Sequence, residues 1–282
     1  MSEFQGRLIV LGATGFVGSN VLARAAKEGW DFVALSSREL DLSSDAAVAT
    51  LASVVMDGDT VIHGAAVAPT RNSTDIVRNL LMTQNIVDSL ASHEIAQFVV
   101  VSSDAVYGSA SGVSNEASPC APDSLHGVMS LAREMVCSGV KSSIITFVRP
   151  TAIYGIGDTH NSYGPNRFVR QALDDGVITV FGAGEAVRDH VAIDDVAEVI
   201  FQTVSTRQAG IINIACGESV SFGFLAQLVR QIGPQGAAVE VTGSESSPTF
   251  RSYDISGLTR RFPDLRMRGV EEGLGDMMGR LT

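Results

Sequence analysis

Short apolar runs alternate with longer segments of helical spacing through the first half of the chain. The apolar runs are too short for helices and predict buried strands. They lie at 7–11, 31–35, 60–66, 97–103 and 142–150. The segments between them predict helices at 16–29, 74–93 and 124–139, the last with Ser124 or Asp123 as its N-cap. Strands that are apolar throughout and alternate with helices are typical of a parallel sheet covered on both faces.

Beyond Pro150 the pattern loosens, and a loop at 154–166 is rich in Gly, Asn and Tyr. Further helices are predicted at 167–176, 193–205 and 221–232, strands at 177–182 and 210–216, and two short helices at the end. We therefore expect an α/β chain with a doubly wound, parallel-sheet domain over 1–150 and a smaller mixed C-terminal lobe over 151–282. The last elements of the first domain, about 185–215, would be interleaved with this lobe, which would cover the crevice beyond the strand ends.

The residues between the first predicted strand and helix form a glycine-rich loop. Gly12, Gly15 and Gly18 have the spacing G-x-x-G-x-x-G. The first glycine permits a tight turn, the second lets the backbone approach a pyrophosphate, and the third lets the helix pack on the strand. The helix N-terminus adds free N–H groups and the positive end of a dipole. In this context the motif predicts a Rossmann domain that binds a dinucleotide.

The end of the second predicted strand bears on which dinucleotide is bound. An acidic residue there would bond the ribose hydroxyls and repel a 2′-phosphate, but the chain has Ser36, Ser37 and Arg38. These side chains suit a 2′-phosphate and favour NADP over NAD. The alternative is that Arg38 is an ordinary exposed loop arginine. Asp41 is placed to accept a hydrogen bond from the adenine amine.

Composition narrows the possible partners and the compartment. The 282-residue chain has a net charge of −11 and no run of Lys or Arg, so we do not expect nucleic-acid binding. The chain start lacks a signal-peptide pattern, and no apolar stretch is long enough to span a membrane. Cys120, Cys137 and Cys216 have no C-x-x-C spacing and predict free thiols in a reducing cytoplasm. The histidines are scattered without ligand spacing, so no metal site is expected.

Six segments carry a family resemblance. They are GATGFVG, VIHGAA, VVVSSDAVYG, VRPTAIYG, VFGAGEAVRDHVAIDDVA and INIACGE. In this order they resemble the extended short-chain dehydrogenases/reductases over residues 7–256, and within these the NAD(P)-dependent nucleotide-sugar epimerases, dehydratases and reductases. The resemblance implies an NAD(P)-dependent oxidoreductase or an epimerase, which is an isomerase, acting on a nucleotide-linked sugar.

The resemblance also implies which residues do the chemistry. In this family a Tyr-x-x-x-Lys helix and a Ser or Thr flank the nicotinamide: the Tyr exchanges a proton, the Lys holds the ribose and the Ser or Thr bonds the reacting oxygen. Ser103 matches the Ser or Thr, whereas HGVMSLARE has His126 in the Tyr place and Ser130 in the Lys place. Positions i and i+4 share a helix face. We therefore predict Ser103, His126 and Ser130 as catalytic residues.

Three interpretations of this departure stay open. His126 exchanges the proton in a working enzyme, because imidazole titrates near neutral pH. Alternatively the site is degenerate, and the chain is a dinucleotide-binding protein or the non-catalytic subunit of an enzyme complex. In the third, His126 only packs against the cofactor and the acid is elsewhere, with Tyr107, Tyr154 and Tyr163 as candidates. The two lysines, Lys27 and Lys141, cannot fill the Lys place on this helix.

The resemblance implies further contacts on both ligands. Additional cofactor contacts are Thr14, Phe16, Val17, Leu42, Ala65, Ala66 and Pro150. Arg188 stands where the family places an arginine on the substrate diphosphate, although it could instead pair with Asp189 or Asp194. The other predicted substrate contacts are Ser103, Asn166, Arg167 and Arg251.

A homodimer is the oligomeric state that the resemblance implies. Family members often pair through two helices, which correspond here to 74–92 and 123–139. Met129, Ala132, Met135 and Val136 are candidates for that interface, but they could equally face the chain's own sheet.

Overall fold

The computed structural model describes residues 6–109, 112–142, 144–233, 236–243 and 249–281, which divide into two compact units. Unit 1 holds the described residues up to Gly108 together with Pro119–Pro150 and Val196–Asn213. Unit 2 holds Ser109–Ser118, Thr151–Asp195 and the described residues from Ile214 onward. No helix within the described ranges is long and apolar enough to cross a membrane.

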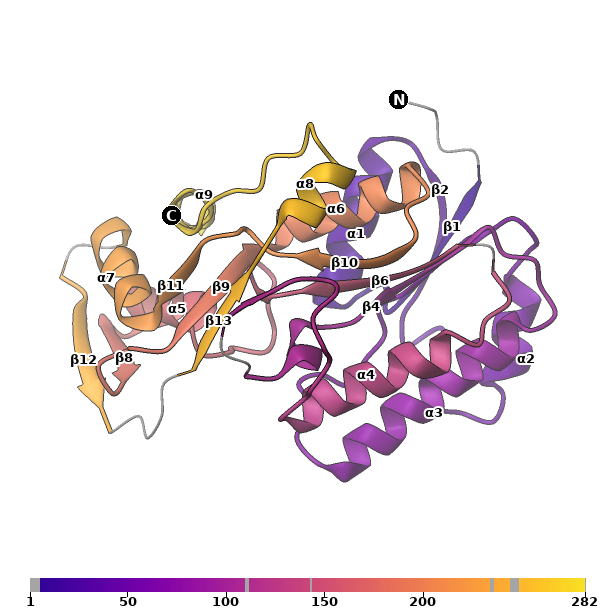
Figure 1. Cartoon of the computed structure of the whole chain (residues 1–282), viewed down its shortest axis with the longest axis horizontal. Helices are drawn as coiled ribbons and strands as arrows, with labels where there is room; N and C mark the ends of the chain where they lie inside the picture. The colour runs from indigo at the N-terminus through magenta and orange to yellow at the C-terminus, as the bar shows by residue number, and fades with distance from the viewer. Residues whose placement is uncertain (1–5, 110–111, 143, 234–235, 244–248, 282) are drawn as a thin grey trace. The chain divides into compact units, whose positions relative to one another are not determined.

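Unit 1 is built on a six-stranded sheet (Figure 1). Its strands are β1 (Arg7–Leu11), β2 (Asp31–Leu35), β3 (Thr60–His63), β4 (Gln97–Val101), β6 (Ile145–Pro150) and β10 (Gly210–Ile214), in the spatial order β10-β6-β4-β3-β1-β2. β1 is parallel to β2 and β3, and β4 is parallel to β3 and β6. The strand order reverses between β1 and β3, the point at which doubly wound sheets bind ligands. The predicted fold class is confirmed.

Helices cover both faces of this sheet. They are α1 (Phe16–Lys27), α2 (Ala47–Val54), α3 (Ser73–Leu90), α4 (Leu125–Cys137) and α6 (Ile193–Ser205). Ile9 and Leu11 of β1 belong to a core cluster with residues of α2, α3 and α4, which lie together in Figure 1. Leu8 and Val10 point the other way and are equally buried. Both sets of side chains are apolar, as the uninterrupted apolar strands predict.

α3 and α4 also expose apolar side chains. Val77, Leu81, Leu125, Val128 and Met135 are between 43% and 72% exposed. Met129, which the sequence offers as an interface residue, is fully buried in the unit's own core. Because Met135 lies six residues further along α4, it reaches a different face of the helix and remains exposed.

Unit 2 contains two smaller sheets. The first has five strands, β5 (Val113–Ser114), β7 (Ala152–Tyr154), β9 (Val187–Ala192), β11 (Ser219–Ser221) and β13 (Phe250–Tyr253), in the order β11-β9-β13-β5 with β7 paired to β9. The second pairs β8 (Val177–Phe181) with β12 (Ala238–Thr242). The helices are α5 (Pro165–Asp174), α7 (Phe222–Ile232), α8 (Ser256–Arg261) and α9 (Val270–Leu281). Phe168, Leu225 and Leu274 join α5, α7 and α9 in one core cluster.

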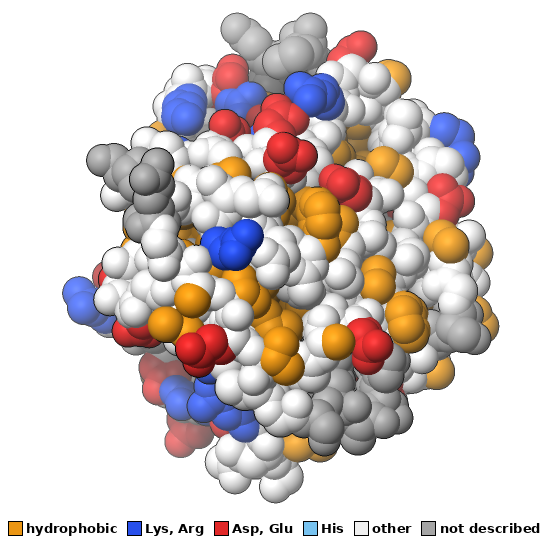
Figure 2. Space-filling model, turned by 90° about the vertical axis from the view of Figure 1, so that its left-hand side faces the viewer, with side chains coloured by type: hydrophobic (Ala, Val, Ile, Leu, Met, Phe, Trp, Pro, Cys, Tyr) orange, Lys and Arg blue, Asp and Glu red, His pale blue; other side chains and the backbone are white. Residues whose placement is uncertain are grey.

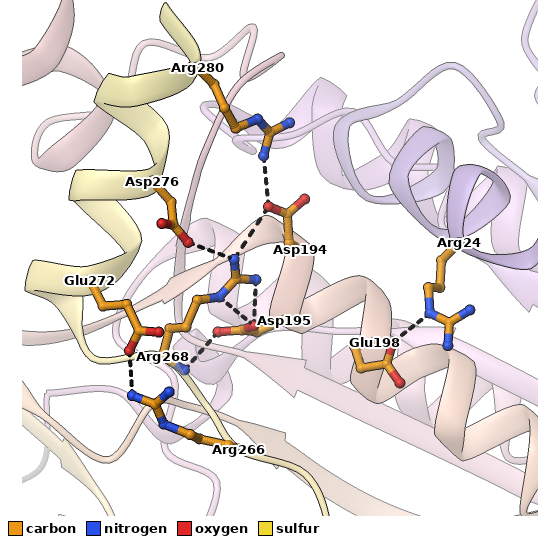
Figure 3. A network of polar contacts seen from close by, with 9 residues as sticks. All are labelled: Arg24, Asp194, Asp195, Glu198, Arg266, Arg268, Glu272, Asp276 and Arg280. Atoms are coloured by element: carbon orange, nitrogen blue, oxygen red, sulfur yellow. Dashed lines mark hydrogen bonds and ion pairs between the residues drawn. The ribbon is translucent and has the colours of Figure 1, made fainter. Parts of the chain in front are cut away.

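Ion pairs fasten α9 within unit 2 (Figure 3). Arg268 donates to the carboxylate of Asp195 at 2.6 and 2.9 Å and to Asp276 at 3.2 Å. Arg280 donates to Asp194 at 2.8 Å. Figure 3 also draws a pair within unit 1, where Arg24 of α1 meets Glu198 of α6 at 2.5 Å. Asp194 and Asp195 are therefore partners of arginines that follow them far along the chain.

On the face drawn in Figure 2, basic side chains lie scattered among acidic ones. Large exposed hydrophobic side chains of unit 2 are Phe181, Phe224, Val241 and Phe250. These are single positions on separate elements, as is common on protein surfaces.

The sequence pattern does not predict α2 or most strands of unit 2. α2 is only eight residues long, and its N-cap, Ala46, makes no side-chain cap. β9 reads VRDHVA, in which Asp189 and His190 are buried polar residues, so the usual apolar pattern of a buried strand is missing. The strands expected at 60–66 and 97–103 end at His63 and Val101, because the residues that follow form turns.

Candidate active site

The glycine-rich loop between β1 and α1 leaves no room for side chains at its first and third glycines. Gly12 has a φ of +86°, and a Cβ there would lie 2.8 Å from the backbone N and Cα of Ala65. A Cβ on Gly18 would overlap the carbonyl oxygen of Gly12. Gly15 is the N-cap of α1, whose first N–H groups receive no side-chain cap. The loop thus presents backbone donors and the positive end of a helix dipole, which suit a phosphate group.

A pocket of about 300 Å³ lies beside this loop within unit 1. Nine of the predicted cofactor residues line it: Gly12, Thr14, Gly15, Ser36, Ser37, Asp41, Leu42, Ala65 and Ala66. Its wall is completed by Leu11, Leu35, Leu40, Gly64, Val67, Arg78 and Met82. The other predicted residues, Phe16, Val17, Gly18, Arg38 and Pro150, lie outside this lining. A pocket with polar and apolar walls next to uncapped backbone donors fits the adenosine diphosphate part of a dinucleotide.

In the turn after β2 the carboxylate of Glu39 is hydrogen-bonded to Ser36. Glu39 accepts hydrogen bonds from the backbone N–H of Ser36 at 2.9 Å and from its hydroxyl. These bonds, the hydroxyl first, lower the pKa of Glu39. Arg38 is exposed, and its backbone N–H donates to the Ser36 hydroxyl at 3.2 Å. The Ser36 hydroxyl is thus engaged within the turn, while Ser37 lines the pocket.

Arg78 and Met82 are pocket residues that the sequence analysis missed. Both belong to α3 and are four residues apart, so they point to the same side of the helix. Arg78 is also close enough to lower the pKa of Asp41, after the larger effect of hydrogen bonds from Ser43. Their i, i+4 spacing on the helix that follows β3, next to the point where the strand order reverses, is the sequence signal that could have identified them as pocket residues.

α4 places His126 and Ser130 on one face, as predicted, but the two side chains differ in access. Ser124 is the N-cap and accepts a hydrogen bond from the N–H of Gly127 at 3.2 Å. A Cβ on Gly127 would overlap the carbonyl oxygen of Ala105, so the first turn packs closely on the 3₁₀ helix Asp104–Tyr107. His126 is half-buried. Ser130 is 1% exposed and donates to the carbonyl of His126 at 2.8 Å, a common back-bond of helical serines.

Ser103 and Tyr107 lie on the turn that follows β4. Ser103 is half-buried, and its hydroxyl accepts from the N–H of Ala105 at 3.1 Å. Tyr107 is buried, donates to Asn213 at 2.8 Å and accepts from Arg149 at 2.9 Å. Arg149 also forms a buried ion pair with Glu134 at 2.6 Å. Tyr107 therefore belongs to a polar network that anchors α4 to β6, and its hydroxyl is not available as an acid.

The two remaining candidate tyrosines are both in unit 2. Tyr154 is 1% exposed, and burial raises its pKa. Tyr163 packs against the rings of Phe168, Phe181 and Phe222, and its hydroxyl accepts from the N–H of Phe181 at 2.9 Å. The Tyr154 hydroxyl is thus buried in the core of unit 2, and the Tyr163 hydroxyl is held by the backbone of β8.

Two arginines lie side by side in the five-stranded sheet of unit 2. Arg188 of β9 and Arg251 of β13 are register partners on parallel strands, so their side chains leave the same face of the sheet. Arg251 donates to the hydroxyl of Ser109 at 3.2 Å. Guanidinium groups that leave one face of a sheet can together bind a phosphate through charge-assisted hydrogen bonds.

The acidic residues considered as partners of Arg188 have other partners. Asp189 is fully buried and accepts from the hydroxyl of Thr151 at 2.9 Å and from the N–H groups of Cys216 and Gly217 at 3.0 and 2.8 Å. Asp194 pairs with Arg280 at 2.8 Å. Burial raises the pKa of Asp189, and the hydrogen bonds partly offset this effect.

The predicted substrate residues Asn166 and Arg167 are both in the first turn of α5. Asn166 is 3% exposed, and its side-chain oxygen accepts from the N–H of Gly155 at 2.9 Å. Asn166 thus holds the loop before the helix. The Arg167 guanidinium lies 5.8 Å from the ring centroid of Phe181 and is half-buried. The Asn166 amide is therefore buried and engaged with Gly155, whereas the charged guanidinium of Arg167 is only half-buried.

The three cysteines are free, as predicted. Burial raises the pKa of the Cys137 and Cys216 thiols to about 12. Neither thiol forms a reactive thiolate near neutral pH. Across the described part of the chain, no three His, Cys, Asp or Glu side chains are grouped to hold a metal ion.

Residues 8–215 match the model of the NAD dependent epimerase/dehydratase family. The chain belongs to this family. It is 25% identical over 284 residues to the uncharacterized UDP-glucose epimerase YtcB of Bacillus subtilis (strain 168), a match covering 89% of this chain and 90% of that protein. The family expected from the sequence motifs is thereby confirmed.

Solved structures share the fold. MoeE5 in complex with UDP-glucose and NAD superposes with a TM-score of 0.84 at 24% identity, covering 97% of this chain and 98% of that one. A GDP-L-fucose synthetase from Naegleria fowleri bound to NADP gives a TM-score of 0.82 at 18% identity, with 98% and 92% coverage. The first of these two structures holds NAD and the second holds NADP.

Proposed function

We propose that this protein is an NAD(P)-dependent oxidoreductase or epimerase that acts on a nucleotide-linked sugar. The observation that carries the proposal is the pairing of Arg188 with Arg251 on adjacent strands. Two guanidinium groups on one face suit the two phosphates of a nucleotide diphosphate, which each can bind through parallel N–H donors. The relatives named for UDP-glucose and the neighbour that holds UDP-glucose support the same substrate class.

The dinucleotide would lie in the pocket of unit 1. Its diphosphate would meet the uncapped N-terminus of α1 and the backbone at Gly12 and Gly15, and its adenine would meet Asp41 and Leu42. A bound nicotinamide supplies the group that accepts or donates a hydride. The protein's part is to hold the cofactor and the sugar and to move a proton.

His126 is proposed to move that proton at the reacting hydroxyl or ketone oxygen. It is half-buried at the start of α4, next to the turn that carries Ser103. The Ser103 hydroxyl is half-buried and still has a lone pair for the same oxygen. Ser130 is proposed to assist by holding the nicotinamide ribose: its hydroxyl donates to the carbonyl of His126 and keeps a lone pair that can accept from a ribose hydroxyl.

NADP is the proposed cofactor in preference to NAD. Arg38 is exposed at the turn after β2, and Arg78 of α3 lines the same pocket as Ser37. A 2′-phosphate between these groups would gain two cationic neighbours. Glu39 opposes the preference, but its carboxylate is turned onto Ser36.

A homodimer formed through α3 and α4 and a cytoplasmic location are also proposed. The exposed side chains of Val77, Leu81, Val128 and Met135 give these helices an apolar outer face that a second copy would cover. The three free thiols suit a reducing compartment.

The proposed function is tested by a turnover screen. Purified protein is incubated with NADP⁺ or NAD⁺, or with the reduced cofactors, and with UDP-, GDP- and dTDP-linked sugars. Products are identified by NMR, which distinguishes epimers of equal mass, and by mass spectrometry. We expect one nucleotide class to be converted, and we expect His126→Ala to lower kcat by about 100-fold or more while dinucleotide affinity is unchanged. Turnover that is equal in His126→Ala would refute the role of His126. If the wild type binds dinucleotide but converts no sugar nucleotide, the chain is a binding protein or a non-catalytic subunit.

A further inference from the structure

A guanidinium group is buried in unit 1 without a carboxylate to balance it. Arg133 of α4 is 3% exposed. Its terminal nitrogens donate to the carbonyls of Ala65 at 3.1 Å and Val101 at 3.4 Å, and to Nε2 of His63 at 2.9 Å. All three acceptors are uncharged. The carboxylate of Glu134 acts on Arg133 through its charge, but it is hydrogen-bonded to Arg149 instead.

The surrounding groups cannot neutralise this charge. Since Arg133 donates to Nε2 of His63, that ring nitrogen is an acceptor and the histidine is neutral. Burial, and then the charge of Arg133, lower the pKa of His63 well below its ordinary value. The adjacent Glu134 is committed to Arg149 at 2.6 Å and to the hydroxyl of Ser102 at 2.5 Å. Within the described ranges, Arg133 forms no ion pair with an acidic side chain.

An uncompensated buried cation is costly in a folded protein, because it loses its hydration. Arginine cannot escape the cost by losing its proton. Such a charge is therefore expected to have an anionic ligand nearby when the protein functions. The position of Arg133 is informative, because one of the two carbonyls that it binds is at the last residue of β4 and the other is two residues beyond the end of β3.

One of those carbonyls belongs to the wall of the cofactor pocket. Ala65 lines the pocket, and its backbone N and Cα lie where a Cβ on Gly12 would be 2.8 Å away. Arg133 is thus separated from the glycine-rich loop by a single residue. Arg133 is bound to the carbonyl of Ala65, whereas Gly12 packs against the backbone N and Cα of the same residue.

We propose that Arg133 is a positioning residue for the dinucleotide diphosphate: its buried charge, held behind Ala65, favours an anion at the glycine-rich loop. This inference rests on the proposed dinucleotide site and adds a residue to it. Arg133 does not touch the ligand. It supplies the electrostatic potential that two phosphate groups neutralise.

The test compares Arg133→Gln and Arg133→Lys, with Arg207→Gln as the matched control. Arg207 is a half-buried arginine of unit 1 that donates to Thr60 at 3.4 Å, at the start of β3 rather than its end. Dissociation constants are measured for ADP-ribose, which carries the diphosphate, and for adenosine, which does not. Thermal melting checks that each variant is folded.

We expect Arg133→Gln to weaken ADP-ribose binding by about tenfold or more and adenosine binding by less than about twofold, because only the charge interaction is lost. Arg133→Lys should recover most of the ADP-ribose affinity, and Arg207→Gln should change neither ligand. Equal losses for both ligands would mean that Arg133 only shapes the pocket, and unchanged ADP-ribose binding would mean that its charge has no effect. Either result would overturn the inference.

If Arg133→Gln does not fold, the same decision rests on Arg133→Lys, which must bind ADP-ribose within about threefold of the wild type. A wild type that binds no ADP-ribose would instead refute the dinucleotide site itself.

Discussion

Arg188 and Arg251 occupy paired positions on the parallel strands β9 and β13, with no shift in register. Their side chains leave the same face of the sheet although the residues are far apart in the sequence. The proposed diphosphate site depends on this arrangement, because guanidinium groups that leave one face of a sheet can together bind phosphate through charge-assisted hydrogen bonds.

Replacing either arginine should weaken the binding of a nucleoside diphosphate. We expect Arg188→Ala and Arg251→Ala each to raise the dissociation constant of UDP about tenfold or more, as loss of a charge-assisted contact of about 1.5–3 kcal/mol requires. Isothermal titration measures the effect, and Arg230→Ala, an exposed arginine of α7, is the control. The melting temperature of the single variants should not fall. Unchanged UDP affinity in both variants would show that the pair is not a phosphate site.

The glycine-rich loop should tolerate no methyl group at Gly12. Gly12→Ala combines a positive φ with overlap on the backbone of Ala65, so we expect a loss of about 2–4 kcal/mol in the free energy of unfolding. Gly29 is the matched control, since its φ is +71° but nothing lies within 4 Å of its Cβ position. Gly29→Ala should cost only about 1 kcal/mol. Urea denaturation measures both values, and equal losses would contradict the close packing of Gly12 on Ala65.

His63 should make the protein less stable in acid. Burial lowers its pKa in the folded state, so the unfolded chain binds a proton more readily. The stability contributed by neutral His63 is present above its unfolded pKa of about 6.5 and is lost as the pH falls below that value. Protonation of His63 should lower the free energy of unfolding by an amount that approaches about 1.4 kcal/mol per pH unit. Urea denaturation between pH 7 and pH 5 should give a smaller slope for His63→Gln than for the wild type, and parallel slopes would contradict this account.

A charge on the outer face of α4 should separate the proposed dimer. Met135 is 72% exposed and Val128 is 43% exposed, so neither side chain is needed for the fold of unit 1. We expect Met135→Glu combined with Val128→Glu to shift the mass measured by light scattering from two copies to one while the melting transition stays cooperative. Phe224→Glu, on an exposed position of α7, should leave the mass unchanged. A wild type that already runs as a monomer would contradict the dimer.

The fold and the cofactor loop were accessible from the sequence because each depends on a local pattern. The spacing of Gly12, Gly15 and Gly18 between a strand and a helix predicts a backbone shape, and the structure has the close contacts that require glycine at the first and third positions. The motif order predicted the family that residues 8–215 match. Ser124 and Asp123 were the two residues predicted as the helix cap, and Ser124 caps α4.

Features that depend on side-chain rotamers or on distant segments were not accessible. The sequence SSREL does not reveal that the Glu39 carboxylate accepts a hydrogen bond from Ser36. Nor does the sequence reveal that the Ser130 hydroxyl donates to the carbonyl of His126 in its own helix. Arg78 and Arg133 reach the pocket region from helices, and their contacts depend on how those helices pack. β9 was missed because its buried residues include an aspartate and a histidine, which a hydrophobic pattern does not count.

The most direct test of the central claim is titration of the protein with NADPH and NADH by calorimetry, in the wild type and in Thr14→Glu. Thr14 is exposed at the edge of the pocket, so a carboxylate there should leave the fold intact and repel the diphosphate. We predict that both dinucleotides bind the wild type, NADPH more tightly, that Thr14→Glu binds neither, and that Arg38→Ala combined with Arg78→Ala removes the preference for NADPH. Failure of the wild type to bind either dinucleotide, or binding that Thr14→Glu does not change, would contradict the site described for this protein.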